Sequence, residues 1–84
     1  MAMGFEISEN ELYKYTGEET SVVIPDGVTK ICDNAFEDNK NITDVVIPDS
    51  VTVIGYKAFM GCIRLKTVIL SKNLIEIEDK AFFG

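Results

Sequence analysis

The chain has 84 residues, of which 14 are acidic and 8 are basic, and its formal net charge is -6 with no histidine. An acidic chain without a stripe of lysine and arginine argues against binding to nucleic acid or to an anionic membrane surface. No apolar run approaches the roughly 18 residues that a membrane span requires, and residues 1–6 lack the basic start and apolar stretch of a signal peptide. We therefore predict a single domain without membrane insertion. Taken literally the chain stays in the cytoplasm, an inference that lapses if it is part of a longer protein.

Residues 1–21 are predicted to form an N-terminal cap. Residues 5–7 and 12–15 alternate apolar and polar side chains on either side of the polar residues 8–11, which indicates a β-hairpin with a four-residue loop. This segment contains five glutamates and one lysine. A hairpin with acidic edges laid on the first repeat would cover its core and discourage edge-to-edge pairing.

From residue 22 onward the sequence repeats every 23 residues. Val22-Val23-Ile24-Pro25 recurs as Val45-Val46-Ile47-Pro48 and as Val68-Ile69-Leu70-Ser71. The same offset aligns Val28, Val51 and Leu74, then Ile31, Ile54 and Ile77, then Ala35-Phe36, Ala58-Phe59 and Ala81-Phe82. Because one such unit cannot bury its apolar side alone, residues 22–84 are predicted to form three stacked 23-residue repeats, the third incomplete.

Each repeat is expected to contain a strand of about four residues, a turn, a second extended stretch and one helical turn. In the second repeat, residues 45–47 are β-branched and Pro48 would end the pairing. Asp49 would bond the backbone of its own turn. Residues 51–54 would be extended, and residues 56–61 are helix formers closed by Gly61. Phe36, Phe59 and Phe82 would stack along the core.

The third repeat stops at Gly84, inside its expected helical turn. Its core-facing side, around Leu74, Ile77 and Phe82, is therefore expected to be uncovered. Either the chain was cut from a longer array, or another chain covers this end.

The second repeat also carries a family resemblance. It contains, in order, Ile42, Val45, Ile47, Pro48, Val51, Ile54, Gly55, Ala58, Phe59 and Cys62. This order resembles the BspA-like leucine-rich repeat family, whose units look like L-x-x-I-x-I-P-x-x-V-x-x-I-G-x-x-A-F-x-x-C. The first repeat departs from the pattern at Cys32 and Asn39, and the third at Ser71 and Glu78, without changing the apolar columns.

The resemblance implies an α/β solenoid: a right-handed leucine-rich-repeat superhelix of about three rungs, rich in strands, with short helical turns and an N-terminal β-hairpin cap. It also implies a bacterial protein that contacts host proteins or other cells. The location would be the cell surface or outside the cell if the chain is a piece of a longer protein. The family shares no binding residues that could be transferred.

The exposed side of the first strand of each repeat is the candidate contact surface. If Val45 and Ile47 face the core, a period of two places the alternate residues outside. Stacking then forms the ladders Ser21/Asp44/Thr67, Val23/Val46/Ile69 and Pro25/Pro48/Ser71. An exposed apolar ladder is a candidate site for a protein or glycan partner. Stabilisation of the strands by cross-strand pairs alone would explain the same residues, and both interpretations stay open.

Other candidate sites are weaker. Asp26 and Asp49 share a column and could hold calcium, but Lys72 takes the third place, which favours turn capping. Tyr13, Tyr15 and Tyr56 would either contact a ligand or cover a cap or repeat edge. Cys32 and Cys62 lie 30 positions apart, and we expect two reduced, buried thiols.

With no histidine and no base beside any serine, the sequence predicts no catalytic residue, no cofactor and no metal site. Two hypotheses follow. The chain is a non-catalytic interaction module that binds through its strand face, or it is a structural element that self-associates through its C-terminal end.

Overall fold

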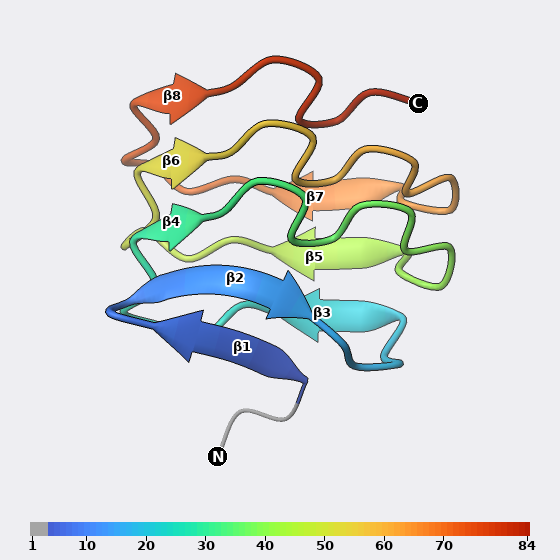
Figure 1. Cartoon of the computed structure of the whole chain (residues 1–84), viewed down its shortest axis with the longest axis horizontal. Coiled ribbons are helices and arrows are strands. Elements are labelled where there is room, and N and C mark those ends of the chain that lie inside the picture. The colour runs from blue at the N-terminus through green and yellow to red at the C-terminus, as the bar shows by residue number, and fades with distance from the viewer. Residues whose placement is uncertain (1–3) are drawn as a thin grey trace.

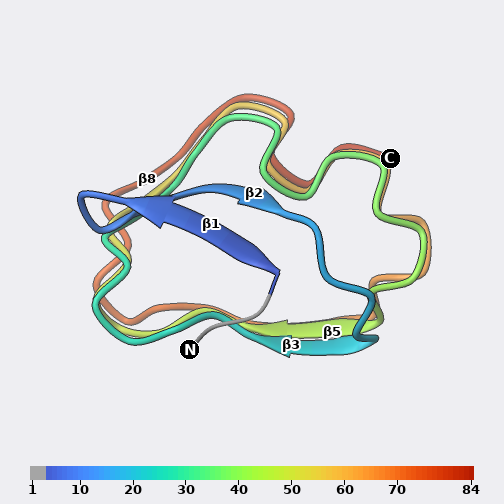
Figure 2. The same ribbon diagram turned by 60° about the horizontal axis from the view of Figure 1, so that its bottom comes forward.

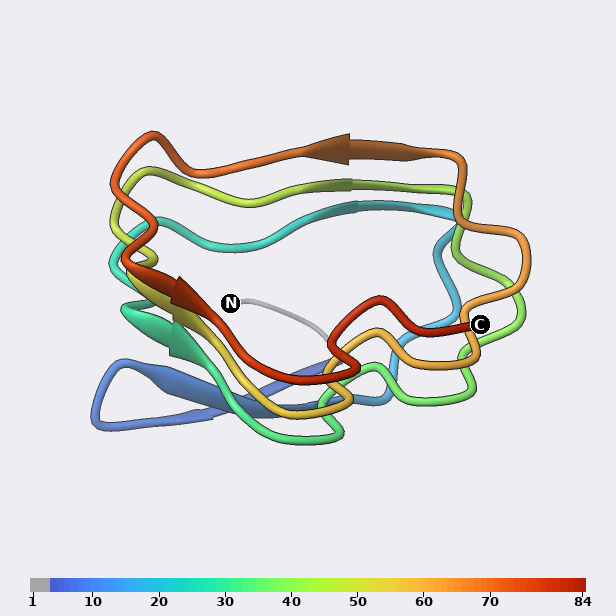
Figure 3. The same ribbon diagram turned by 90° about the horizontal axis from the view of Figure 1, so that it is seen from above.

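The computed structural model describes residues 4–84, and its eight strands form two sheets that face each other (Figures 1 and 3). The strands are β1 (Phe5–Ser8), β2 (Glu11–Tyr15), β3 (Ser21–Val23), β4 (Lys30–Ile31), β5 (Asp44–Val46), β6 (Val53–Ile54), β7 (Thr67–Ile69) and β8 (Glu76–Ile77). One sheet has the order β1-β2-β4-β6-β8 and the other the order β3-β5-β7. From β2 onward, the chain alternates between the two sheets.

The strand pairing has the period of the sequence. Val22 pairs with Val45 and Val45 with Val68, while in the other sheet Ile31 pairs with Ile54 and Ile54 with Ile77. Each of these partners lies 23 residues after the first, and the strands are parallel. The 23-residue repeat is therefore the distance along the chain between neighbouring strands of each sheet.

The core lies between the two sheets. Val22, Ile24, Val45 and Ile47 are between 1% and 3% exposed, as the predicted alternation requires. The predicted stack of phenylalanines is confirmed: the ring centroids of Phe36 and Phe59 are 4.7 Å apart, and those of Phe59 and Phe82 are 5.0 Å apart. Tyr15 continues this stack beyond Phe36 at 5.1 Å, so the cap and the repeats share one aromatic column.

The predicted helical turn is wrong. Residues 4–84 contain strands, turns and irregular segments but no helix, and residues 56–60 form turns. The reason is the direction of alternate amides. Phe36 N donates to Ala58 O of the next repeat at 2.7 Å, while Ala58 N donates to Gly55 O within its own turn at 3.2 Å. A helix would direct every amide to its own segment, but stacking uses every second one between repeats. Lys57, with φ 57°, also breaks the right-handed path.

The N-terminal hairpin is confirmed, with a shorter loop than predicted. β1 and β2 are antiparallel, and Ser8 pairs with Glu11 instead of lying in the loop. The two loop residues, Glu9 and Asn10, have φ values of 51° and 66°. A two-residue turn with both φ values positive matches the right-handed twist of the flanking strands.

The cap extends only one of the two sheets. β2 pairs in parallel with β4, so the hairpin supplies two of the five strands of this sheet. Leu12 and Tyr15 of β2 are 0% and 5% exposed, and the cap thus covers the core of the first repeat as expected. In Figure 2 the hairpin lies along its own sheet, whereas β3 is the outermost strand of the other.

Candidate interaction surface

The outer face of β3, β5 and β7 carries two of the three predicted ladders. The pairing register places Ser21 beside Asp44 and Asp44 beside Thr67, and it places Val23 beside Val46 and Val46 beside Ile69. Val23 is 66% exposed and Ile69 is 56% exposed, while Val46, between them, is half-buried. We call Val23, Val46 and Ile69 the apolar ladder.

The third ladder does not form on this face. Ser71 was expected beside Pro25 and Pro48 on the outside, but it is 6% exposed and its hydroxyl donates to Val51 O at 2.7 Å. The strands end one residue earlier than predicted, at Val23, Val46 and Ile69. Beyond those residues the chain turns a corner, so the period of two no longer determines which side a residue faces.

A groove of about 530 Å³ opens where the chain leaves the three strands. All three residues of the apolar ladder line it, together with Pro25 and Pro48. Asp26, Asp49 and Lys72, from the turns that follow the strands, also line the groove. The face predicted from alternation therefore includes a hollow with an aliphatic wall and charged neighbours.

On the other side of the apolar ladder the face is polar. The Ser21 hydroxyl donates to Asp44 Oδ2, and the Thr43 hydroxyl donates to Thr20 O at 3.2 Å. These bonds join neighbouring repeats and occupy the Asp44 carboxylate. The ladder of Ser21, Asp44 and Thr67 thus contributes to the stacking as well as to the surface.

Two aspartates, Asp49 and Asp33, bond the neighbouring repeat. Asp49 Oδ1 accepts from Lys72 N at 2.9 Å, 23 residues further along the chain. Asp33 Oδ1 accepts in the same way from Tyr56 N at 2.9 Å. The predicted capping within one turn is therefore wrong for Asp49, because the amide of the next repeat lies closer in space than sequence distance indicates. Within residues 4–84, no three His, Cys, Asp or Glu side chains group as a metal site would require.

The third repeat exposes positions that the earlier repeats bury. Ile77 is 47% exposed, although Ile31 and Ile54 of its column are 0% exposed. Phe82 is 38% exposed, compared with 1% for Phe36 and Phe59. Leu74 is half-buried and packs against the core cluster. Ile77 and Phe82 of the third repeat are thus more exposed than their equivalents in the first two repeats.

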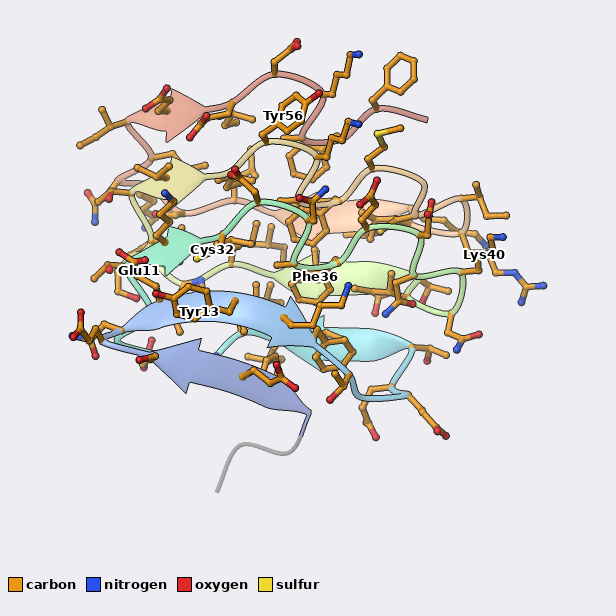
Figure 4. The ribbon with its side chains drawn as sticks, viewed as in Figure 1. Glu11, Tyr13, Cys32, Phe36, Lys40 and Tyr56 are labelled. Atoms are coloured by element: carbon orange, nitrogen blue, oxygen red, sulfur yellow. The ribbon has the colours of Figure 1, made fainter. Side chains whose placement is uncertain are left out.

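The three tyrosines have different surroundings. Tyr15 is buried in the aromatic column and serves as cover. Tyr13 and Tyr56 are labelled in Figure 4. Tyr13 on β2 is 49% exposed. The ring of Tyr56 has Lys57 Nζ at 5.1 Å from its centroid. Sequence reasoning missed Tyr15 as a member of the phenylalanine column. Strict alternation would place Leu12 and Tyr15, which are three residues apart, on opposite sides of β2. The pairing with β1 is irregular, because Ile7 pairs with Leu12 and Glu6 with Lys14, and this irregularity lets both Leu12 and Tyr15 be buried.

Both cysteines are free and buried, as predicted. Burial raises the pKa of Cys62 to about 11, and its thiol donates to Phe36 O at 3.1 Å. Burial also raises the pKa of Cys32, with a further contribution from the negative charge of Glu11, which lies beside it in Figure 4. Both thiols are therefore held in the protonated form, which is a poor nucleophile.

No helix long and apolar enough to cross a membrane occurs in residues 4–84.

The repeat columns, the parallel register and the stacked phenylalanines agree with a family model. The model of the BspA type Leucine rich repeat region (6 copies) matches residues 6–84. The chain belongs to the BspA-type leucine-rich repeat family. The match confirms the resemblance seen in the second repeat and extends it to the cap, most of which the model includes.

Solved structures of bacterial leucine-rich repeat proteins share this fold. A leucine-rich repeat protein of T. pallidum is 31% identical with a TM-score of 0.90 over 99% of this chain. One from Bacteroides capillosus ATCC 29799 is 36% identical over 92% of the chain, with a TM-score of 0.77. A leucine rich cell surface protein from Faecalibacterium prausnitzii A2-165 is 34% identical over 98% of the chain, with a TM-score of 0.81.

This BspA-type chain spans 44%, 69% and 27%, respectively, of the lengths of those three proteins. No curated protein matches it. The leucine-rich repeats themselves support the role of an interaction module, since stacked repeats present extended surfaces to partners.

Proposed function

We propose that this chain is a non-catalytic interaction module of a bacterial leucine-rich repeat protein, built as a right-handed solenoid of three rungs. It binds a partner protein through the outer face of β3, β5 and β7. The observation that carries this proposal is the apolar ladder of Val23, Val46 and Ile69, two of whose three side chains are exposed and which lines a groove. Apolar surface gathered at a concave site beside polar groups is typical of interaction sites.

The groove favours a protein partner over a glycan. Its apolar lining is aliphatic and includes two prolines, and none of the aromatic rings on which sugars stack lines it. An extended peptide would fit in this groove, with an apolar side chain against the apolar ladder and its backbone beside Asp26 and Asp49 of the turns. A glycan is the alternative partner, and it would depend on the polar residues Asp44 and Thr67.

The similarity to a cell surface protein of F. prausnitzii supports a location on the cell surface or outside the cell for the protein to which this chain belongs.

Selection of ligands on the purified chain tests the proposal. We would select from a library of random peptides and from a glycan array, and measure the affinity of each hit for Ile69→Glu and Val46→Glu variants. The matched control is Ile75→Glu, because Ile75 is 82% exposed and lies outside β7. A glutamate in the apolar ladder is expected to weaken peptide binding by at least tenfold, roughly 1.4 kcal/mol, while Ile75→Glu has no effect.

Equal binding by all three variants would remove the strand face as the site. The glycan alternative predicts that only glycans are selected. Their binding would be unchanged in Val46→Glu and Ile69→Glu and lost in Asp44→Ala, and this result would show that the partner is a sugar and not a protein.

A second candidate function is self-association through the third repeat. It is favoured by the surface of Leu74, Ile77 and Phe82, of which Ile77 is 47% and Phe82 is 38% exposed. Pairing of two such ends by a two-fold axis would bury these residues on both copies. Light scattering coupled to size exclusion is the test: a dimer converted to a monomer by Ile77→Glu supports this candidate, and a monomer at high concentration excludes it.

A further inference from the structure

The two sheets end differently on the N-terminal side. The five-stranded sheet continues past β4 with β2 and β1, whereas the three-stranded sheet ends at β3. Among residues 4–84, β5 is the only strand that pairs with β3. Figure 2 shows β3 as the foremost strand of its sheet, with the hairpin lying over the other sheet. Within the described part of the chain, one edge of β3 therefore has no strand beside it, and we call it the open edge.

The hydrogen bonds of this sheet identify the backbone groups at the open edge. Ile24 N donates to Val46 O at 3.0 Å, and Asp44 N donates to Thr20 O at 3.3 Å. Along a parallel strand, alternate residues bond to opposite neighbours. Since Thr20 and Ile24 bond toward β5, Ser21 and Val23 direct their N–H and C=O groups away from it. No backbone group in residues 4–84 bonds to these four.

Side-chain exposure agrees with this assignment. Ser21 is exposed and Val23 is 66% exposed. Their equivalents in the middle strand, Asp44 and Val46, are half-buried. Ser21 and Val23 are more exposed because β3 has a neighbouring strand on one side, whereas β5 has one on each side.

Two acidic residues, Glu18 and Glu19, lie on the segment that leads into β3. A hollow of about 400 Å³ lies at the same end of the molecule, lined by Tyr15, Thr16, Gly17, Glu18 and Glu19 together with Gly4. Glu18 and Glu19 are exposed and precede β3 by a few residues, and Glu19 N donates to the Tyr15 hydroxyl at 3.3 Å. That bond anchors the segment carrying both carboxylates to the buried aromatic column. The acids discourage pairing with an acidic strand and favour a basic one.

We infer that the open edge of β3 binds an extended basic peptide segment of a partner protein as an added strand. The N–H and C=O groups of Ser21 and Val23 bond the peptide backbone, and its lysine or arginine side chains lie against Glu18 and Glu19. This site is distinct from the outer face of the sheet, because it uses the edge of one strand. The inference therefore goes beyond the proposed function.

The occupant is a single strand and not the C-terminal end of a second copy. Continued stacking would place β7 of that copy against β3 and its β8 against β4. β2 already occupies the position beside β4. The hairpin thus blocks one sheet and leaves the other open, which selects a partner that contributes one strand.

The experiment uses the whole chain and two synthetic peptides, one alternating valine and lysine and the other alternating valine and glutamate. The lysine peptide is expected to bind and the glutamate peptide not to bind. With the lysine peptide at ten times its Kd, amide hydrogen exchange at Ser21 and Val23 is expected to slow about tenfold, because only the free fraction exchanges. Equal binding of both peptides, or unchanged exchange at these two amides, would overturn the inference.

Val23→Pro removes the outward amide without removing a bond to β5, and proline is tolerated at a sheet edge. This variant is expected to lower the affinity for the lysine peptide about tenfold, because one hydrogen bond is lost and the edge is altered. Val23→Thr keeps the amide and the branched side chain, so its effect measures the contribution of the side chain alone, and a loss equal to that of Val23→Pro would show that the amide does not bind the peptide. Glu18→Gln with Glu19→Gln weakens binding and reduces its dependence on salt.

Ile69→Glu separates this site from the proposed strand-face site. It lies on β7, two strands from the open edge, and leaves binding of the lysine peptide intact. If Ile69→Glu abolishes binding of the lysine peptide and Val23→Pro does not, the peptide binds at the strand face and the edge site is wrong. Failure of strand-face ligands alone would leave the edge site standing.

Discussion

Replacement of Phe59 by alanine is expected to remove a large part of the stability of the chain. Phe59 is 1% exposed and stacks on two rings, Phe36 at 4.7 Å and Phe82 at 5.0 Å. Truncation of a buried phenylalanine to alanine costs about 3–5 kcal/mol. A chain of 84 residues has a free energy of unfolding of about 4–13 kcal/mol. Phe59→Ala is therefore expected to remove between about a quarter and all of this stability.

Phe82 is the matched control because it occupies the same column with one ring neighbour fewer. It is 38% exposed, so about three fifths of the burial remains to be lost, and Phe82→Ala is expected to cost about 2–3 kcal/mol. Urea unfolding followed by far-ultraviolet circular dichroism measures both variants, with the slope of the transition checked for two-state behaviour. A cost for Phe82→Ala equal to or above that for Phe59→Ala would refute the argument from stacking and burial.

Three other substitutions test the contacts between repeats. Gly55→Ala is expected to cost at least about 1–3 kcal/mol in urea unfolding, since its Cβ would lie 2.5 Å from Asp33 Oδ1 and 2.7 Å from Asp33 N; wild-type stability would show that the backbones are further apart. Asp49→Ala should cost about 1 kcal/mol by losing the bond to Lys72 N, and Asp49→Asn should cost less because its amide oxygen still accepts. For Cys62, the folded pKa of about 11 exceeds the ordinary value of 9.0, so between these pH values the unfolded chain releases the thiol proton and the folded chain keeps it. The stability of the wild type relative to Cys62→Ala should then fall as pH rises from about 9 to about 11 and stay level below that range, and a pH-independent difference would contradict the assignment.

The register of the two sheets could be predicted from the sequence because the repeats have equal length. When Val22 recurs as Val45 and Val68 at a fixed offset, stacking places the three side by side, and their shared apolar character puts all three in the core. The phenylalanine column follows for the same reason. Alternation along a strand then placed Val23, Val46 and Ile69 on the outside.

Contacts between repeats could not be predicted from local sequence. Residues 56–60 have helix-forming composition, yet alternate amides of this segment bond the neighbouring repeat, and that choice depends on a partner 22 positions away. Asp49 bonds Lys72 N for a similar reason. Ser71 is buried because the chain turns directly after Ile69, where strand alternation stops applying.

By itself, the sequence determined the repeat, the core columns, the hairpin and the residues of the apolar ladder, because each depends on periodicity or on residues close together in the chain. The tertiary structure alone decided that the hairpin extends one sheet and that one edge of β3 has no strand beside it within residues 4–84. It also decided that the apolar ladder opens onto a groove with Asp26, Asp49 and Lys72. Both features depend on how the cap and the corners pack in space, where residues distant in sequence compete for the same backbone partners.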